Sequence, residues 1–225
     1  FSDSKYPSGI AMITVDHKAE NCITVAPGAN MNLTPTDLAK ARSAIDEADI
    51  ILLQLEIPME TVEYVAKVAK KQNKKVILNP APAIYDDQNI LESVDILTPN
   101  LEEAKKLYCL PYHINIDDMG KYLAKKVRNI LIITLGDKGC LLVKDKKYKY
   151  YPAFKVKALD TTGAGDIFNA AFATMIAKEN SIDEAIRYAM AAAALSVTKP
   201  YVINSIPNND EICKFLKLYN LKQKY

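Results

Sequence analysis

The chain has 225 residues, enough to bury a full core as one domain or one and a half. Apolar residues make up 49% of it and charged residues 25%, as in an ordinary globular protein, and a net charge of +2 does not indicate a polyanion-binding surface. The four cysteines show no C-x-x-C spacing, and no apolar run reaches the roughly 18 residues that span a bilayer. We expect no signal peptide. We therefore expect a cytoplasmic protein with reduced thiols, no zinc site, and no nucleic-acid or membrane partner.

The first predicted elements are a hairpin and a helix. "GIAMITVD" and "ENCITVAPG" are β-rich runs separated by the polar "HKA", which predicts two paired strands. "LTPTDLAKARSAI" then predicts one helix, capped by Thr34 and favoured by Asp37 in its first turn.

Strands and helices alternate along the rest of the chain. Further strands are predicted in "DIILLQLE", "KVILN", "VDILTPN" and "NILIITLG", followed by a hairpin of "GCLLVKD" and "KYKYYPA". Helices are predicted at 58–72, in "LEEAKKLY", around "DDMGKYLAKKV", and at 163–178, 182–197 and 210–221, with a capping box from Ser181 to Glu184. This alternation predicts an α/β domain with a largely parallel sheet.

The stretch "DTTGAGD", Asp160 to Asp166, places two of the chain's seven glycines just before a predicted helix. A helix N-terminus binds anions through its free N–H groups, and glycines let a ligand oxygen come close. Asp166 in the first turn could then accept a proton from a hydroxyl that attacks phosphorus. The alternative is a connection of small residues with Asp at the helix start. A P-loop is excluded, and Phe168 replaces the third glycine of a dinucleotide motif.

Two weaker motifs follow predicted strands. In "TPNLEEA", Asn100 and Glu103 have the spacing of a capping box, but at the end of a parallel strand they could also support phosphates and hydrated Mg²⁺. "TLGDKG", residues 134–139, is mainly a turn signal, although its amides and Lys138 could contact phosphate.

The ordered set "TPNLEEA … ITLGDKG … DTTGAGD" resembles the ribokinase-like carbohydrate kinases over essentially the whole chain. "PSGIAMITVD", "ITVAPGAN", "LLQLEIP" and "LNPAPA" are similar to the ribose-specific members rather than to fructokinases or adenosine kinases. The resemblance implies a three-layer α/β/α sandwich with a mostly parallel central sheet and a small β lid. It also implies phosphorylation of D-ribose at its 5-hydroxyl by ATP, with Mg²⁺ and an activating K⁺, and a homodimer formed through the lid.

The resemblance also implies roles for particular residues. Asp166 would be the catalytic base and would contact the sugar, and Gly163, Ala164 and Gly165 would form the anion hole. Glu56 and Asn30 would contact the sugar as well. The ATP and Mg²⁺ side would comprise Asn100, Glu103, Thr134, Leu135, Gly136, Asp137, Lys138, Gly139, Gly165, Asp166 and Met190, with Glu103 reaching Mg²⁺ through water.

The monovalent cation would be bound by two segments, through Asp160, Thr162, Ser196, Lys199, Tyr201 and Ser205. Here the sequence departs from the family, because Pro200–Tyr201 stands where a glycine-containing turn is usual. We expect a backbone carbonyl to coordinate the ion from a loop of different shape.

Relative to the family, about the first quarter of the chain is missing. We expect 1–30 to form part of the lid and its connection, and 31–225 to form the ATP-binding core with an unpaired sheet edge. The missing part would carry much of the sugar site. Two alternatives therefore stay open, namely a kinase of the same family acting on another sugar or a nucleoside, and a catalytically silent nucleotide-binding fragment.

Overall fold

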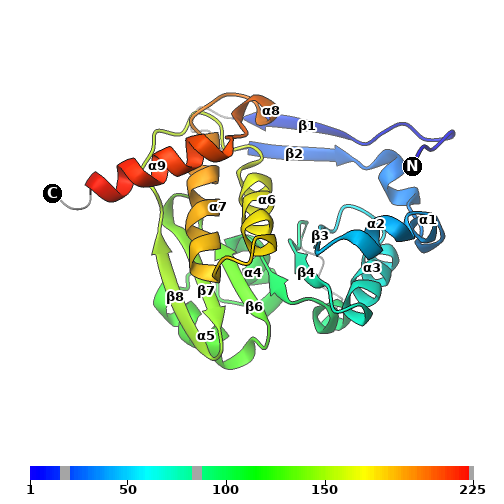
Figure 1. Ribbon diagram of the computed structural model, residues 1–225, viewed down its shortest axis with the longest axis horizontal. Coiled ribbons are helices and arrows are strands. Elements are labelled where there is room, and N and C mark those ends of the chain that lie inside the picture. Colours follow the sequence, from blue (N-terminus) through cyan, green and yellow to red (C-terminus); the bar gives the residue numbers. More distant parts are fainter. Residues whose placement is uncertain (16–20, 83–87, 223–225) are drawn as a thin grey trace. The chain divides into compact units, whose positions relative to one another are not determined.

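The computed structural model describes residues 1–15, 21–82 and 88–222 (Figure 1). The predicted hairpin connection "HKA" lies outside these residues. The chain divides into two compact units. Unit 1 comprises Phe1–Ile13, Ile23–Leu135 and Cys140–Tyr150, and unit 2 comprises Thr14–Cys22, Gly136–Gly139 and Tyr151–Tyr225. The expected division at 30/31 stays a prediction.

A six-stranded sheet has the strand order β3-β4-β5-β6-β7-β8. Its first four strands are parallel, and β7 is antiparallel to β6. Their bounds are β3 Ile50–Leu53, β4 Lys75–Leu78, β5 Ile96–Leu97, β6 Ile130–Thr134, β7 Gly139–Lys144 and β8 Lys147–Pro152. A second, two-stranded sheet pairs β1 (Ile10–Val15) with β2 (Asn21–Ala26). The expected fold class, a mostly parallel sheet flanked by helices plus a small antiparallel sheet, is confirmed.

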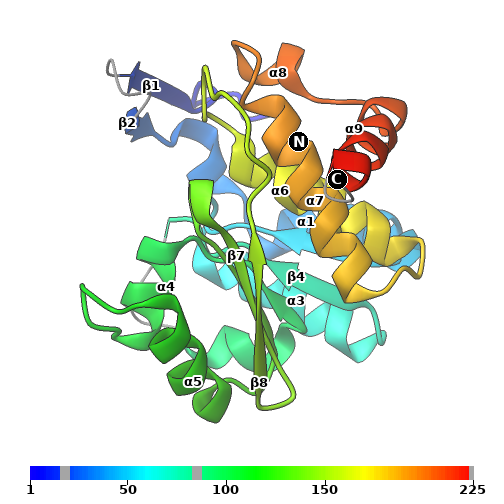
Figure 2. The same ribbon diagram turned by 90° about the vertical axis from the view of Figure 1, so that its left-hand side faces the viewer.

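The two ends of the large sheet are built differently. β7 and β8 are joined by Asp145 and Lys146, whose positive φ values of 51° and 60° suit a two-residue hairpin turn (Figure 2). At the other end, β3 pairs only with β4 among the described residues. An unpaired edge of this kind was expected from the sequence.

Two strands are shorter than their apolar runs predicted. "DIILLQLE" contributes only the four residues of β3, because the chain then bends and the N–H of Leu55 donates to Ala81 O at 3.0 Å. "VDILTPN" contributes only Ile96–Leu97, since Pro99 has no N–H to continue the ladder. An apolar run indicates that its residues are buried, but it does not indicate at which residue the strand stops pairing with its neighbour.

The helix predicted from "LTPTDLAKARSAI" is two helices, α1 (Pro35–Lys40) and α2 (Arg42–Glu47). Ala41 interrupts it with φ −100° and ψ 19°, and its N–H bonds three residues back, to Leu38 O. The predicted cap is confirmed, because Thr34 and Asp37 form a capping box.

Unit 1 buries its core between the sheet and its helices. α3 (Met59–Lys71) packs on β3 and β4 through one face, on which Val62, Ala66 and Ala69 are fully buried. α4 (Leu101–Tyr108) packs on β6, and α5 is Ile116–Lys126. Three short 3₁₀ helices were not predicted: η1 (Gly28–Asn32), η2 (Gln88–Ser93) and η3 (Gly136–Lys138).

Unit 2 is built mainly on two helices that pack along each other, α6 (Ala164–Ala177) and α7 (Ile182–Ser196). Phe172 and Ile186 are fully buried there. α9 (Asn209–Lys222) packs against α7, and the predicted capping box of Ser181 and Glu184 begins α7. The short α8 (Val202–Ser205) was not predicted.

No helix in the described part of the chain is long and apolar enough to cross a membrane. Within the same residues, no three His, Cys, Asp or Glu side chains form a cluster that could hold a metal ion. None of the four cysteines is part of a disulfide, and burial raises the pKa of Cys140 to about 12.

Candidate active site

In unit 1, Asn100 of one predicted motif and Thr134, the first residue of another, lie at the carboxyl ends of adjacent strands. Asn100 follows β5 and forms an isolated parallel bridge with Thr134, the last residue of β6. The N–H of Thr134 donates to Pro99 O at 2.9 Å. Ligands of open α/β sheets bind at such ends, so this edge can present polar groups to a ligand.

Asn100 and Glu103 form a complete capping box at the start of α4. Asn100 Oδ1 accepts from the N–H of Glu103 at 2.8 Å, and Glu103 Oε2 accepts from the N–H of Asn100 at 2.7 Å. Burial raises the pKa of Glu103, while the Asn100 N–H and the charge of Lys106 act in the opposite direction. Glu103 Oε1 has no hydrogen-bond partner among the described residues. This oxygen is available to hold hydrated Mg²⁺, which proteins bind through one or two carboxylates.

The predicted loop after β6 forms η3 and is bounded by two glycines with positive φ, Gly136 at 59° and Gly139 at 109°. A Cβ at Gly139 would lie 2.0 Å from Tyr151 O, so the β7–β8 pairing itself requires glycine there. Leu135 is buried, whereas Asp137 and Lys138 are exposed. The turn reading of this motif is confirmed, and its contact with a nucleotide stays a prediction.

In unit 2, α6 begins without a side-chain cap, in contrast to α4, α5 and α7. Asn100, Asn115 and Ser181 cap α4, α5 and α7, but α6 has Gly163 at the capping position and no side-chain hydrogen bond. Gly163 has φ 74°, and a Cβ there would lie 2.7 Å from Val202 Cγ1. Glycine at 163 is therefore required by the fold.

Gly165, two residues further on, borders open space. A Cβ at Gly165 would meet no atom within 4 Å, and its φ is not positive, so the fold does not require this glycine. The N–H groups of Gly165 and Asp166 have no acceptor among the described residues, whereas that of Ala164 donates to Thr161 O at 3.2 Å. Uncapped N–H groups at the positive end of a helix attract an anion.

The Asp166 carboxylate has no hydrogen-bond or ion-pair partner in the described part of the chain. The residue keeps solvent contact, yet burial raises the pKa of its carboxyl above the usual value. A raised pKa increases the basicity of the ionised carboxylate. The group is thus free to accept a proton from a ligand hydroxyl.

The two segments predicted to bind a monovalent cation lie against each other in unit 2. The N–H groups of Leu159 and Asp160 both donate to Val197 O, at 2.7 and 3.3 Å. Asp160 Oδ1 accepts from the N–H of Thr162 at 2.9 Å, and Oδ2 accepts from the N–H of Tyr201 at 3.3 Å. The Thr162 hydrogen bonds, followed by that of Tyr201, lower the pKa of Asp160, which holds it ionised. The structure thus brings together Asp160, Thr162 and Tyr201.

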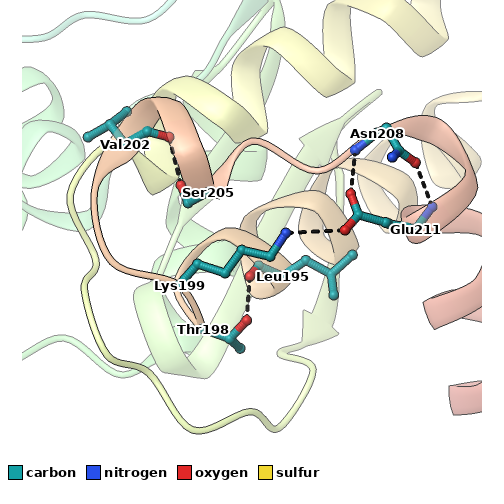
Figure 3. A network of polar contacts seen from close by, with 7 residues as sticks. All are labelled: Leu195, Thr198, Lys199, Val202, Ser205, Asn208 and Glu211. Carbon is teal, nitrogen blue, oxygen red and sulfur yellow. Dashed lines mark hydrogen bonds and ion pairs between the residues drawn. The ribbon is translucent and has the colours of Figure 1, made fainter.

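Several side chains of the second segment already have partners in unit 2 (Figure 3). Ser205 Oγ donates to Val202 O at 2.8 Å, and Lys199 Nζ pairs with Glu211 at 3.2 Å. Ser196 Oγ similarly donates to Ala193 O at 2.8 Å. Coordination of a cation from this segment would therefore rest mainly on backbone carbonyls.

Tyr201 adopts the backbone shape expected of a glycine, with φ 64° and ψ 144°. Its side chain is 73% exposed, so packing does not offset the strain of this conformation.

We expect Tyr201→Gly to raise the free energy of unfolding by about 1 kcal/mol, because relief of a strain of roughly 1–3 kcal/mol exceeds the entropy cost of glycine. Urea unfolding measures the change. Tyr201→Ala is the matched control, since it removes the ring but keeps Cβ and the strain. Equal stability of both variants would contradict the strain argument.

The sequence matches the pfkB family of carbohydrate kinases over residues 2–209. The chain belongs to this family. It is 39% identical over 222 residues to a ribokinase of Haemophilus influenzae, covering 95% of this chain and 71% of that one. It is 34% identical to a deoxyribokinase of Salmonella typhi, and the match covers 94% of this chain and 70% of that one. The solved structure of a ribokinase of Arabidopsis thaliana, complexed with ribose and ATP, superimposes on this chain with a TM-score of 0.82 at 32% identity. The match covers 95% of this chain and 70% of that one.

Membership of the pfkB family makes this chain a sugar kinase, an enzyme that transfers phosphate to a carbohydrate. The remaining predicted residues belong to other elements of the chain. Glu56 follows β3 and is exposed, and Asn30 lies in η1 with an exposed side chain. Met190 is 8% exposed on α7.

Two contacts of this pfkB-family site were not predicted. Val202 packs against Gly163, and the Val197 carbonyl joins the two segments that were predicted to bind a cation. Each contact spans more than 35 residues of sequence, and no local motif marks either of them.

Proposed function

We propose that this chain transfers the γ-phosphoryl group of ATP to the 5-hydroxyl of D-ribose. The observation that carries the proposal is the start of α6. There, two N–H groups and the Asp166 carboxylate have no partner among the described residues, and a Cβ at Gly165 would meet open space. The ribokinases among the relatives, one of them solved with ribose and ATP, support ATP and ribose as the substrates.

Asp166 is the proposed base and sugar contact. Its carboxylate would accept the proton of the 5-hydroxyl as that oxygen attacks the γ-phosphorus and ADP leaves. General base catalysis of this kind contributes roughly 10²–10⁴ in rate.

The start of α6 would neutralise the transferred phosphoryl group, through the N–H groups around Gly163, Ala164 and Gly165. Phosphoryl transfer needs such positioning and charge stabilisation more than covalent chemistry. Bound Mg²⁺ would neutralise further charge on the phosphates, held through water by Glu103. We assign the nucleotide to Thr134–Gly139 and Met190, and further sugar contacts to Glu56 and Asn30.

We also propose an activating K⁺ beside Asp160. The ionised Asp160 carboxylate supplies negative charge, and carbonyls of Thr162, Ser196, Lys199, Tyr201 and Ser205 would complete the site. The hydrogen bonds from Thr162 and Tyr201 to Asp160 hold the two segments together, which supports this assignment.

Asn100→Ala separates the capping role of Asn100 from a nucleotide role. Loss of the cap should cost about 1 kcal/mol of stability. Asn115→Ala is the matched control, because Asn115 caps α5 in the same way, accepting from the N–H of Asp118 at 2.9 Å. We expect both variants to lose similar stability in urea unfolding, and only Asn100→Ala to weaken Mg-ATP binding in calorimetry. Equal Mg-ATP affinity in the two variants would show that Asn100 acts only as a helix cap.

The experiment that tests the function is ADP release from Mg-ATP with D-ribose, 2-deoxy-D-ribose, D-fructose or adenosine, each with K⁺ or Na⁺. The greatest kcat/KM is expected for D-ribose with K⁺. Faster turnover of 2-deoxy-D-ribose would favour the second candidate, a deoxyribokinase, for which the Salmonella typhi relative is the evidence. ATP binding without release of ADP for any acceptor would leave only a nucleotide-binding function.

We propose a homodimer formed through the β1–β2 sheet. Ile10, Met12 and Val25 on this sheet are 63%, 66% and 54% exposed, and clustered exposed apolar residues mark interaction surfaces. Light scattering should give twice the chain mass, and Met12→Lys should lower it toward the monomer. Leu218→Lys, at a 52% exposed leucine on α9, is the control and should leave the mass unchanged. A monomeric wild-type chain would contradict the proposal.

A further inference from the structure

Unit 1 contains a cavity of about 870 Å³ that the proposed reaction does not use. Its walls come from η2, β5, the last turns of α4 and α5, and the connection from α5 to β6. The residues that line it are Leu91, Glu92, Leu97, Leu107, Tyr108, Cys109, Tyr122, Lys126, Val127, Arg128 and Asn129. The volume lies within the range of about 300–1,000 Å³ that is usual for small-molecule sites.

The cavity is distinct from the nucleotide residues of unit 1. Asn100 and Thr134 lie at the carboxyl ends of β5 and β6. The cavity instead adjoins Val127–Asn129, which precede β6, and Tyr108, the last residue of α4. It therefore opens near the amino end of β6, whereas the proposed phosphate side lies at the carboxyl end. The paths of α4 and α5 can be followed in Figure 2.

One wall is held in place by hydrogen bonds. Asn129 Nδ2 donates to Leu91 O at 2.7 Å and also to Val94 O, so the connection before β6 is fastened to η2. At the end of α4, two carbonyls are already engaged, because Leu110 N donates to Lys105 O at 2.9 Å and Cys109 N donates to Lys106 O at 3.4 Å. Hydrogen bonds thus hold the backbone around the cavity in place, and leucines and Val127 form its apolar lining.

The charges at the cavity favour an anion. Arg128 is exposed and has no hydrogen-bond or ion-pair partner among the described residues. Lys126 Nζ lies 4.6 Å from the centroid of the Tyr122 ring, so that cation and aromatic face are presented together. Glu92 is the one acidic residue of the lining, against these two cations.

The Tyr108 phenol adds a neutral donor. A tyrosine hydroxyl is protonated at neutral pH, and burial raises the pKa of Tyr108 further, to about 12. It has no hydrogen-bond partner within the described residues and can donate to a ligand.

We propose that this cavity binds a small amphipathic organic anion, with its acidic group at Arg128 and Lys126 and its apolar body against Leu91, Leu107 and Val127. A guanidinium pairs well with carboxylate, sulfonate or phosphate oxygens, and the apolar walls exclude water from the rest of the ligand.

The first test uses 8-anilino-1-naphthalenesulfonate as the probe, whose fluorescence reports transfer to an apolar site. We expect saturable binding to the folded chain that excess Mg-ATP does not displace. The double variant Lys126→Glu with Arg128→Glu should weaken binding about tenfold or more, because it replaces two attractions by repulsions. Lys125→Glu is the matched control, since Lys125 is an exposed neighbour on α5 that does not line the cavity. Near-UV circular dichroism checks that each variant is folded.

Two further readouts locate the probe and test its charge. Cys109 lines the cavity and Cys22 does not, and both thiols are exposed. The bound probe should slow iodoacetamide labelling of Cys109 and leave Cys22 unchanged. The uncharged analogue N-phenyl-1-naphthylamine should bind at least about tenfold more weakly. Displacement by Mg-ATP, unprotected Cys109, equal binding of the uncharged analogue or an unaffected double variant would each overturn the proposal.

Discussion

Asp166→Asn is expected to lower turnover by about 10²–10⁴-fold while Mg-ATP binding is retained. The amide keeps the size of the side chain and the start of α6, but it cannot accept the proton of the sugar hydroxyl. Sugar-dependent ADP release measures turnover, and calorimetry measures ATP binding. Asp210→Asn is the matched control, because Asp210 also lies exposed in the first turn of a helix, α9.

The same variant has a second signature in its response to pH. Since burial raises the pKa of Asp166, wild-type kcat/KM should fall with decreasing pH earlier than an ordinary aspartate would cause. The raised pKa also means that folding favours the protonated carboxyl. This stabilisation is complete below the pKa of the unfolded chain and is lost as pH rises through the folded-state value. Asp166→Asn should therefore not reduce stability at neutral pH. Turnover within a few-fold of wild type would remove Asp166 from the mechanism.

Gly165→Ala should reduce turnover by about 10²-fold without loss of stability. The fold has room for the added methyl, because no atom lies within 4 Å of a Cβ at 165, and alanine is favoured over glycine inside a helix. The proposed transferred phosphoryl group would occupy this same space, and displacing a reacting group by about 1 Å can cost 10²-fold in rate.

Gly163→Ala provides the contrast to Gly165→Ala. A Cβ at 163 would meet Val202 and would be strained at φ 74°, so this variant should lose stability in thermal unfolding. If Gly165→Ala turned over within a few-fold of wild type, the open space at 165 would not be the phosphoryl site. If it instead unfolded as readily as Gly163→Ala, a packing role for Gly165 would have to replace the proposed one.

Local sequence predicted the helices and their starts well. α4 has the bounds of "LEEAKKLY", and the caps at Thr34 and Ser181 form as expected. These features depend on contacts three or four residues apart, which the spacing of residue types reveals directly. The break at Ala41 was not predicted, because alanine and its neighbours are good helix formers.

The residues of the predicted site motifs determine only part of the conformation and position of these motifs. Asn100 and Glu103 form the capping box that their spacing allowed, and only their bridge to Thr134 brings them to the strand ends where a nucleotide can bind. Tyr201 gave no local signal of a glycine-like conformation. It adopts φ 64° where its N–H donates to Asp160, 41 residues away.

Periodicity and short motifs were enough to predict the α/β class, the order of elements, the helix caps and the resemblance to the carbohydrate kinases, because each can be recognised within short stretches of the chain. Only the folded structure showed where β3 ends, that Gly163 is required by the fold and Gly165 is not, and that a cavity lies beside Arg128. These features arise from contacts between distant segments, and no spacing within one segment records which atoms another segment brings to it.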